Sequence, residues 1–214
     1  INDGGRIMDV TRDYYFPKPV WRTSLLKDIE LKPIVDQIYR LEKINKSRHR
    51  SNRGPLNFQS EDFKYDADKK DDALNDLLVH IGSLVYAIHQ TDRRGEVILS
   101  NAWFNINRKD GMNIPHTHPG SMYSGVIWLK ASEGSGEFVI NETEERMMIQ
   151  SDSFYGRLKD PTNPPPHWCC EWSFKPIEGD ILIFPSFLSH QVMPNNNEDD
   201  RISVSFNFQV NDQW

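Results

Sequence analysis

The spacing of apolar residues changes along the chain, from a helical period in the first half to a strand period in the second. Apolar positions three and four residues apart predict one helix from Leu31 to Ile44 and another from about Lys70 to Gln90. Both helices are expected to pack one face against the core. The segment 47–69 between them is rich in Asn, Arg, Asp and Gly, which predicts a loop.

From Val97 onward, short apolar runs alternate with Gly, Pro and Asn, a pattern typical of many short β-strands. The candidate strands are 97–107, 113–118, 122–130, 136–140, 145–150, 169–174, 180–184, 189–193 and 201–210. This order predicts a mainly β sandwich or barrel with N-terminal helices packed on one face. We expect a single domain over 1–214, with a helical layer over about 1–95 and the β core over about 96–214.

Two of these strands carry polar faces that are unusual for solvent-exposed positions. In the last strand, apolar residues from Ile202 to Val210 face one side, and polar residues from Arg201 to Gln209 face the other. In the first strand, Asn105 and Asn107 share a face, although Asn is depleted in strands. We interpret both polar faces as the lining of a ligand cavity inside a sheet curled into a barrel.

A candidate metal site begins with His116 and His118, which lie between Pro115 and Pro119. The prolines disfavour a helix, and on an extended segment residues i and i+2 point to the same side, so the two imidazoles converge. His190 follows a buried strand and a short turn, where it supplies a third ligand. Imidazole suits iron, zinc, copper and nickel, so the ligands alone do not choose the metal.

Arg201 begins the last strand and shares its polar face with Ser203. An Arg that faces a cavity needs an anion, because a buried unpaired charge is costly. A guanidinium fork beside a hydroxyl suits a carboxylate. Together with the histidines, Arg201 therefore predicts an Fe(II) site that faces a bound 2-oxo acid, whose far carboxylate ends on the guanidinium.

Charge and composition narrow the expected partners. The formal net charge is −6, so nucleic acid is not an expected partner. No stretch approaches the roughly 20 apolar residues of a membrane helix. The two cysteines, Cys169 and Cys170, are adjacent and form no disulfide framework. We expect an intracellular, cytoplasmic protein, and nothing in the composition indicates its oligomeric state.

Several segments, taken in order, resemble those of the 2-oxoglutarate/Fe(II)-dependent oxygenase superfamily. They are Trp103 to Asn107, His116 to Ser121, Ser124 to Leu129, Phe184 to Ser186 with His190, and Arg201 to Asn207. The chain is more narrowly similar to a group of such oxygenases, with a His-x-His-Pro motif, found in bacteria and in phages of marine cyanobacteria. The resemblance covers most of the chain and is weakest between about 141 and 178.

The resemblance implies a double-stranded β-helix, or jelly-roll, of the cupin-like kind, packed on helices. It implies His116 and His190 as iron ligands, and Arg201 with Ser203 as the site of the 2-oxoglutarate side-chain carboxylate. It also matches strand positions that line the cosubstrate pocket, namely Asn105, Asn107 and Asn207. The implied reaction converts 2-oxoglutarate, O₂ and a substrate into succinate, CO₂ and a hydroxylated substrate, with a peptide or protein side chain as the favoured substrate.

The sequence departs from the superfamily at His118, where most members have an Asp. Strand geometry favours His118 as the third ligand, and Glu137, Asp180 or water are the alternatives. Two other functions are open: a three-histidine dioxygenase of a small molecule without 2-oxoglutarate, and a non-catalytic metal-binding module. Arg201 argues against the first, since that chemistry needs no second carboxylate anchor, and the three histidines argue against a binding module that keeps the barrel but not the metal.

Overall fold

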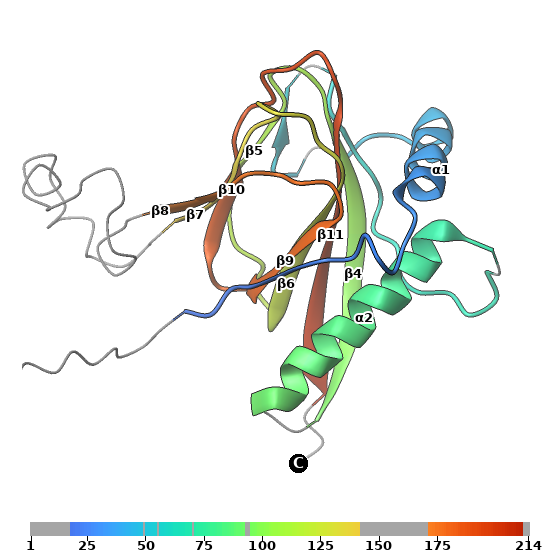
Figure 1. Ribbon diagram of the computed structural model, residues 1–214, viewed down its shortest axis with the longest axis vertical. Coiled ribbons are helices and arrows are strands. Elements are labelled where there is room, and N and C mark those ends of the chain that lie inside the picture. The colour runs from blue at the N-terminus through green and yellow to red at the C-terminus, as the bar shows by residue number, and fades with distance from the viewer. Residues whose placement is uncertain are drawn as a thin grey trace, which may run out of the picture.

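The computed structural model describes residues 18–48, 50–54, 56–69, 71–92, 95–141 and 171–211. Two antiparallel sheets face each other, and two helices lie on the outer side of one of them (Figure 1). In chain order the elements are β1 (Trp21–Ser24), α1 (Leu31–Ile44), β2 (Asn52–Arg53), β3 (Phe58–Gln59), α2 (Ala73–Asp92), β4 (Glu96–Asn107), β5 (Met112–His116), β6 (Tyr123–Lys130), β7 (Phe138–Asn141), β8 (Glu171–Phe174), β9 (Asp180–Pro185), β10 (Ser189–Val192) and β11 (Arg201–Asn211).

The larger sheet has the strand order β1-β9-β6-β11-β4-β3, and the smaller sheet has the order β2-β5-β10-β7-β8. The mainly β jelly-roll with helices on one face is thus confirmed. The expectation of a closed barrel is wrong, because the described strands form two separate sheets. Each sheet ends in a strand of two residues, β3 or β2, that pairs with one neighbour, so no continuous ladder joins the sheets.

The helices cover the larger sheet through a shared apolar core. Ile38 of α1 and Ile81 of α2 are fully buried in the same cluster as the apolar residues of β11. The members of that cluster from β11 are Ile202, Val204, Phe206 and Phe208. The predicted alternation is therefore confirmed: the apolar face of β11 packs on the helices, and its polar face points toward the smaller sheet.

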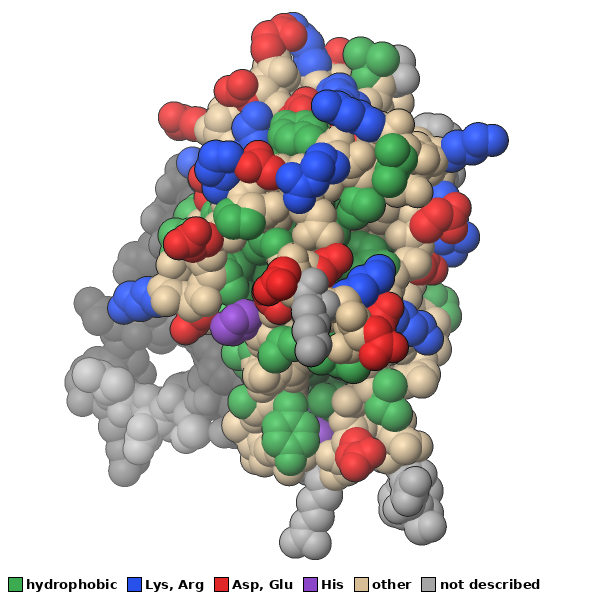
Figure 2. Space-filling view, turned by 90° about the vertical axis from the view of Figure 1, so that its right-hand side faces the viewer, with side chains coloured by type: hydrophobic (Ala, Val, Ile, Leu, Met, Phe, Trp, Pro, Cys, Tyr) green, Lys and Arg blue, Asp and Glu red, His purple; other side chains and the backbone are tan. Residues whose placement is uncertain are grey.

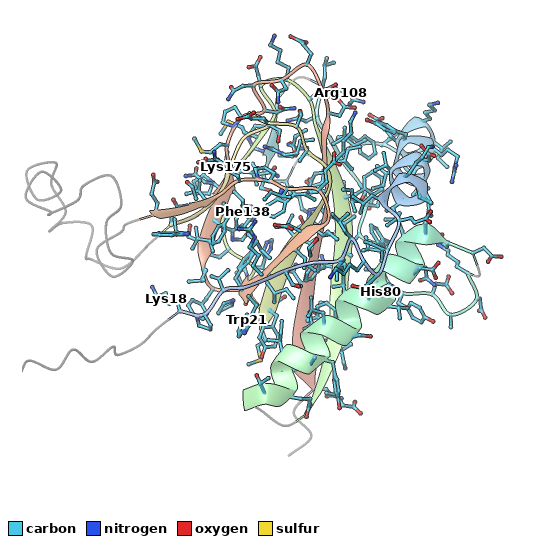
Figure 3. All side chains as sticks on the ribbon, viewed as in Figure 1. Lys18, Trp21, His80, Arg108, Phe138 and Lys175 are labelled. Atoms are coloured by element: carbon cyan, nitrogen blue, oxygen red, sulfur yellow. The ribbon has the colours of Figure 1, made fainter. Side chains whose placement is uncertain are left out.

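Strands β6 and β9 are buried on both faces, which explains their uninterrupted apolar sequences. Ile127 belongs to the helix-side core, whereas the neighbouring Trp128 belongs to a second core between the sheets. Phe138 of β7 lies in this second core (Figure 3), with its ring centroid 6.3 Å from that of Trp128 and 5.4 Å from that of Phe184. The sandwich is thus closed by aromatic contacts next to the polar face of β11.

Local capping explains where the second helix begins. The first helix has the predicted bounds. The second begins at Ala73 rather than at about Lys70, because the Asp72 carboxylate accepts a hydrogen bond of 2.9 Å from the Asn75 N–H. The segment 47–69 is more than the predicted loop, since it contributes β2 and β3, and β1 was not predicted either.

Some predictions fall outside the described part of the chain. They concern the candidate strand 145–150 and the cysteine pair Cys169 and Cys170. Over the face that carries the helices, basic and acidic side chains are intermixed, and no broad area of one sign is visible there (Figure 2). None of the helices in the described ranges is long and apolar enough to span a membrane.

Candidate metal centre and cosubstrate pocket

The structure brings the three predicted histidines together. His116 ends β5 and lies opposite His190 of β10 in the smaller sheet. The potential ligand atoms of His116, His118 and His190 all lie within 4.8 Å of one another. His118 follows the end of the strand, and its main-chain N–H donates a hydrogen bond of 3.0 Å to the carbonyl of Ser186. This bond to the turn after β9 fixes the backbone that directs His118 toward the other two rings.

Hydrogen bonds orient two of the rings for metal binding. The Nδ1–H of His116 donates to the Ile114 carbonyl at 2.7 Å, and that of His190 donates to the Leu188 carbonyl at 2.9 Å. In each ring the Nε2 lone pair is left to a metal. Burial, together with the nearby charge of His116, lowers the pKa of His190 to about 3 and that of His118 to about 4. Neutral imidazoles at pH 7 are the form that binds a metal, so this donor set fits Fe(II).

Neither acidic alternative belongs to this cluster. Among the described residues, the group of potential ligands at this place consists of the three histidines alone. Asp180 is engaged elsewhere, where its carboxylate accepts a hydrogen bond of 3.0 Å from Nε of Arg22. Glu137 lies on the turn before β7, and its main-chain carbonyl accepts a hydrogen bond from the Met193 N–H.

The histidines line a pocket of about 480 Å³, including its open mouth, between the two sheets. The other lining residues are Ser51, Trp103, Asn105, Asn113, Gly125, Val126, Trp128, Phe138, Phe184, Val192, Arg201, Ser203 and Ser205. Of the residues expected to contact the cosubstrate, Arg201, Ser203 and Asn105 are therefore brought to the metal centre. The polar faces of β4 and β11 supply them, as the alternation predicted.

The remaining two predicted cosubstrate residues do not line this pocket. The Asn107 amide nitrogen donates to Oδ1 of Asn52 at 3.2 Å. The Asn207 amide nitrogen donates to Oδ1 of Asn101 at 3.0 Å, and its oxygen accepts a hydrogen bond of 2.7 Å from Ser124. Both amides are thus engaged with other side chains, and a contact of either residue with the cosubstrate stays a prediction.

Arg201 is a buried cation with one hydrogen-bonding group left over. Its side chain lies in a residue that is only 1% exposed, and Nη1 donates to the main-chain carbonyls of Ser135, Gly136 and Met193. Nη2 is buried and has no hydrogen-bond partner among the described residues. Burial lowers the pKa of the guanidinium to about 9, which leaves it charged at pH 7. A buried charge with a free donor in a pocket fits an anionic ligand.

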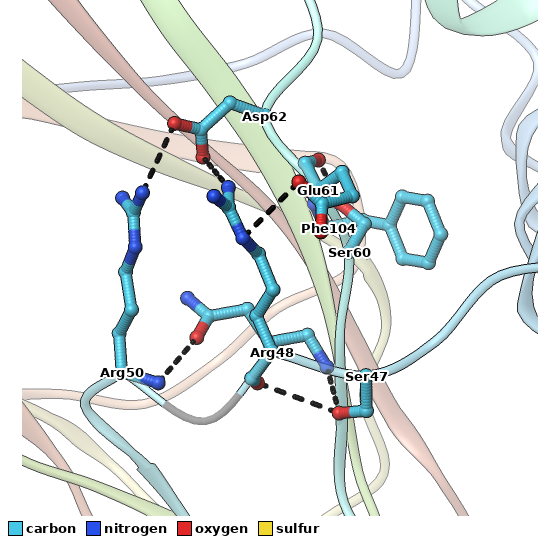
Figure 4. A network of polar contacts seen from close by, with 8 residues as sticks. Ser47, Arg48, Arg50, Ser60, Glu61, Asp62 and Phe104 are labelled. Atoms are coloured by element: carbon cyan, nitrogen blue, oxygen red, sulfur yellow. Dashed lines mark hydrogen bonds and ion pairs between the residues drawn. The ribbon is translucent and has the colours of Figure 1, made fainter.

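Sequence reasoning missed the Ser51–Asn113 pair on the opposite wall of the pocket. The Asn113 amide nitrogen donates to the Ser51 hydroxyl at 3.1 Å. No spacing in the sequence connects Ser51 with the histidines. Its segment is fixed by ion pairs, from Arg48 to Glu61 at 3.2 Å and from Arg48 and Arg50 to Asp62 at 3.3 and 3.4 Å (Figure 4).

Several solved structures are similar to this chain in fold. A Pseudomonas putida prolyl-4-hydroxylase has 14% identity and a TM-score of 0.61, over 91% of this chain and 94% of that one. A Trichoplax adhaerens prolyl hydroxylase, in complex with a hypoxia inducible factor peptide fragment, has 12% identity and a TM-score of 0.62, over 89% and 83%. The epimerase SnoN in complex with Fe³⁺, alpha ketoglutarate and nogalamycin RO has 14% identity and a TM-score of 0.62, over 90% and 79%.

At these identities the similarities show the fold. No curated protein matches the sequence significantly. A family profile described as "Putative 2OG-Fe(II) oxygenase" matches residues 101–207, which is half of the chain and includes the three histidines and Arg201. The chain therefore belongs to the 2OG-Fe(II) oxygenase family, whose members are non-haem iron enzymes that consume 2-oxoglutarate and O₂.

Proposed function

We propose that His116, His118 and His190 hold the Fe(II), and that Nη2 of Arg201, with the Ser203 hydroxyl, binds the far carboxylate of 2-oxoglutarate. One observation carries this proposal: the same pocket is lined by a three-histidine cluster and by a buried cation, one of whose donors has no partner within the described ranges. When bound, the iron supplies the O₂ chemistry that couples decarboxylation of 2-oxoglutarate to oxidation of a substrate C–H bond. The protein supplies ligands, orientation and a dry site.

Aromatic side chains surround the proposed iron ligands. The Phe138 ring lies nearly parallel to that of His190, with centroids 5.4 Å apart, and the Phe184 ring lies 4.8 Å away. On the other side, the Trp103 ring lies 5.5 Å from that of His118. These contacts hold the imidazoles in place and limit the access of water to the metal centre.

The two rival functions are not favoured. A three-histidine dioxygenase without 2-oxoglutarate would leave the buried charge of Arg201 without a role, and the matching family uses 2-oxoglutarate. A non-catalytic metal-binding module would use the three histidines but would not require the buried cation of Arg201 in the same pocket.

We further propose that the chain hydroxylates a peptide or protein side chain, with a prolyl residue as the first candidate. The similar fold of prolyl hydroxylases, one of them bound to a peptide, supports this substrate class by analogy. The polar pair Ser51 and Asn113 offers hydroxyl and amide groups at the pocket wall, which suit the amide groups of a peptide backbone.

The cofactor assignment is tested by following the conversion of 2-oxoglutarate to succinate with Fe(II). His190→Ala and Arg201→Ala should each lower turnover strongly, the first through metal content and the second through the KM for 2-oxoglutarate. His80→Ala, a histidine substitution on α2 (Figure 3), is the matched control and should retain turnover. Full activity in both pocket variants would refute the assignment.

The substrate class is tested separately, by incubating the iron-loaded enzyme with a library of proline-containing peptides. The expected result is a product heavier by one oxygen atom, formed together with succinate. Coupled turnover with small molecules, and none with any peptide or protein, would overturn the peptide proposal and leave the cofactor assignment standing.

A further inference from the structure

Two turns that are distant in the sequence meet at Arg201. One connects β6 to β7 over 131–137, and the other connects β10 to β11 over 193–200. Hydrogen bonds join them: Met193 N–H donates to the Glu137 carbonyl at 2.8 Å, and Asn196 N–H donates to the Gly134 carbonyl at 3.2 Å. The Asn197 amide adds a bond of 3.1 Å to the Ser132 hydroxyl. The two turns are therefore held as one unit.

This unit presents a carbonyl cradle, defined as the main-chain carbonyls of Ser135, Gly136 and Met193, to Nη1 of Arg201. Neutral carbonyls hold the guanidinium in place but leave its charge uncompensated. A carboxylate in the same position would neutralise Arg201 and compete with an anionic ligand. The cradle occupies Nη1, whereas Nη2 has no partner among the described residues and is available to a ligand.

Gly136 occupies a position in the cradle that no other residue fits. Its φ is +87°, in the left-handed region that favours glycine. A Cβ added there would lie 2.3 Å from the Met193 carbonyl oxygen, 2.5 Å from that of Pro194 and 2.6 Å from Nη1 of Arg201. Two of these contacts are with main-chain atoms, so relief would require the turns to separate or the guanidinium to move.

We propose that Gly136 is a positioning residue for 2-oxoglutarate: the absence of its side chain lets the carbonyl cradle close on Nη1 and fixes the direction in which Nη2 meets the cosubstrate. This inference rests on the proposed role of Arg201. It adds that selectivity for a 2-oxo acid with a second carboxylate depends on a turn that contributes no side chain to the pocket.

The chain offers a matched control two residues away. Gly134 has a φ of +81°, but a Cβ there would meet only the Asn197 side chain, at 3.4 Å or more. Alanine strains the backbone similarly at both positions, and only Gly136→Ala intrudes on Arg201. We expect the KM for 2-oxoglutarate to rise about tenfold or more in Gly136→Ala, as for the loss of a charge-assisted hydrogen bond, and to change by less than about twofold in Gly134→Ala.

Three further readouts separate positioning from general damage to the fold. The value of kcat at saturating 2-oxoglutarate and the affinity for Co²⁺ should stay near those of the wild type, because no histidine is touched. Inhibition by 2-oxobutyrate, which lacks the far carboxylate, should also be unchanged. Equal weakening of both acids, or no rise in the KM for 2-oxoglutarate, would overturn the proposal.

Asn197→Ala is a second test of the same inference, to be used if Gly136→Ala does not fold. It removes the Asn197 amide bonds to Ser132 and, at 2.6 Å, to the Glu133 carbonyl, and it introduces no new atom. A looser cradle should raise the KM for 2-oxoglutarate about threefold, as for one neutral hydrogen bond, without loss of Co²⁺ affinity. An unchanged KM would then refute the inference. If Arg201→Ala itself leaves the KM unchanged, the proposed function fails instead.

Discussion

Gly125 of β6 lies at a point of close packing within the larger sheet. A Cβ added at this position would lie 2.3 Å from the ring of Phe206 and 2.6 Å from the carbonyl oxygen of Leu182. Neither neighbour can yield easily. Phe206 is fully buried and packs edge-to-face on Phe208, with centroids 5.9 Å apart, and β9 pairs with β6 along this stretch. Gly125→Ala must therefore displace a strand or an aromatic ring.

The size of the effect follows from two opposing contributions. Overpacking a well-packed core costs about 1–3 kcal/mol, and replacing Gly by Ala returns about 0.5–1 kcal/mol of backbone entropy. The net expectation is a loss of about 1–2 kcal/mol in the free energy of unfolding, which lowers the Tm of a chain of this length by about 2–8 °C.

Gly82, on α2, provides the opposite case with the same substitution. A Cβ there would meet nothing within 4 Å. Gly82→Ala should raise the free energy of unfolding by about 0.5–1 kcal/mol, because Ala is the better helix former. Calorimetry or chemical denaturation of both variants measures the difference. A Gly125→Ala protein as stable as the wild type would refute the packing argument for this position.

Three further predictions concern the pocket, a tyrosine of α1 and the metal. Arg201→Lys keeps the charge but loses the planar fork, so the KM for 2-oxoglutarate should rise about tenfold or more. Ser203→Ala removes one hydroxyl and should raise this KM about two- to tenfold. Equal effects of the two substitutions would contradict the proposed anchor. Burial and a hydrogen bond of 2.8 Å to Asp200 raise the pKa of Tyr39. The contribution of this group to the free energy of unfolding is complete below about pH 10 and is lost as the pH rises further. In Tyr39→Phe, the free energy of unfolding measured by denaturation should therefore fall less steeply above about pH 10. A chelator should lower the Tm of iron-loaded wild type, which binds metal only when folded, and leave that of His190→Ala nearly unchanged.

Local periodicity was sufficient for the long elements. The apolar positions of α1 and the alternation of β11 each repeat over several turns or pairs, so the buried face of each could be read directly. The short strands β2 and β3 could not be found this way, because two residues carry no period. They form because hydrogen bonds hold the chain beside β4 and β5, such as those from the Ser60 N–H to the Phe104 carbonyl and from the Ile114 N–H to the Ser51 carbonyl.

For the candidate site, the sequence by itself determined which side chains share a face. The two-residue period of an extended segment places His116 and His118 on the same side of their segment, and Arg201 and Ser203 on the same face of the last strand. The two sheets then bring both pairs to one pocket. Only the tertiary structure decided what each polar group contacts. The sequence did not show that main-chain carbonyls hold Nη1 of Arg201, or that Asn107 is engaged by another amide. The physical reason is that these partners come from turns and strands distant along the chain, and hydrogen bonds between them depend on packing that no local pattern encodes.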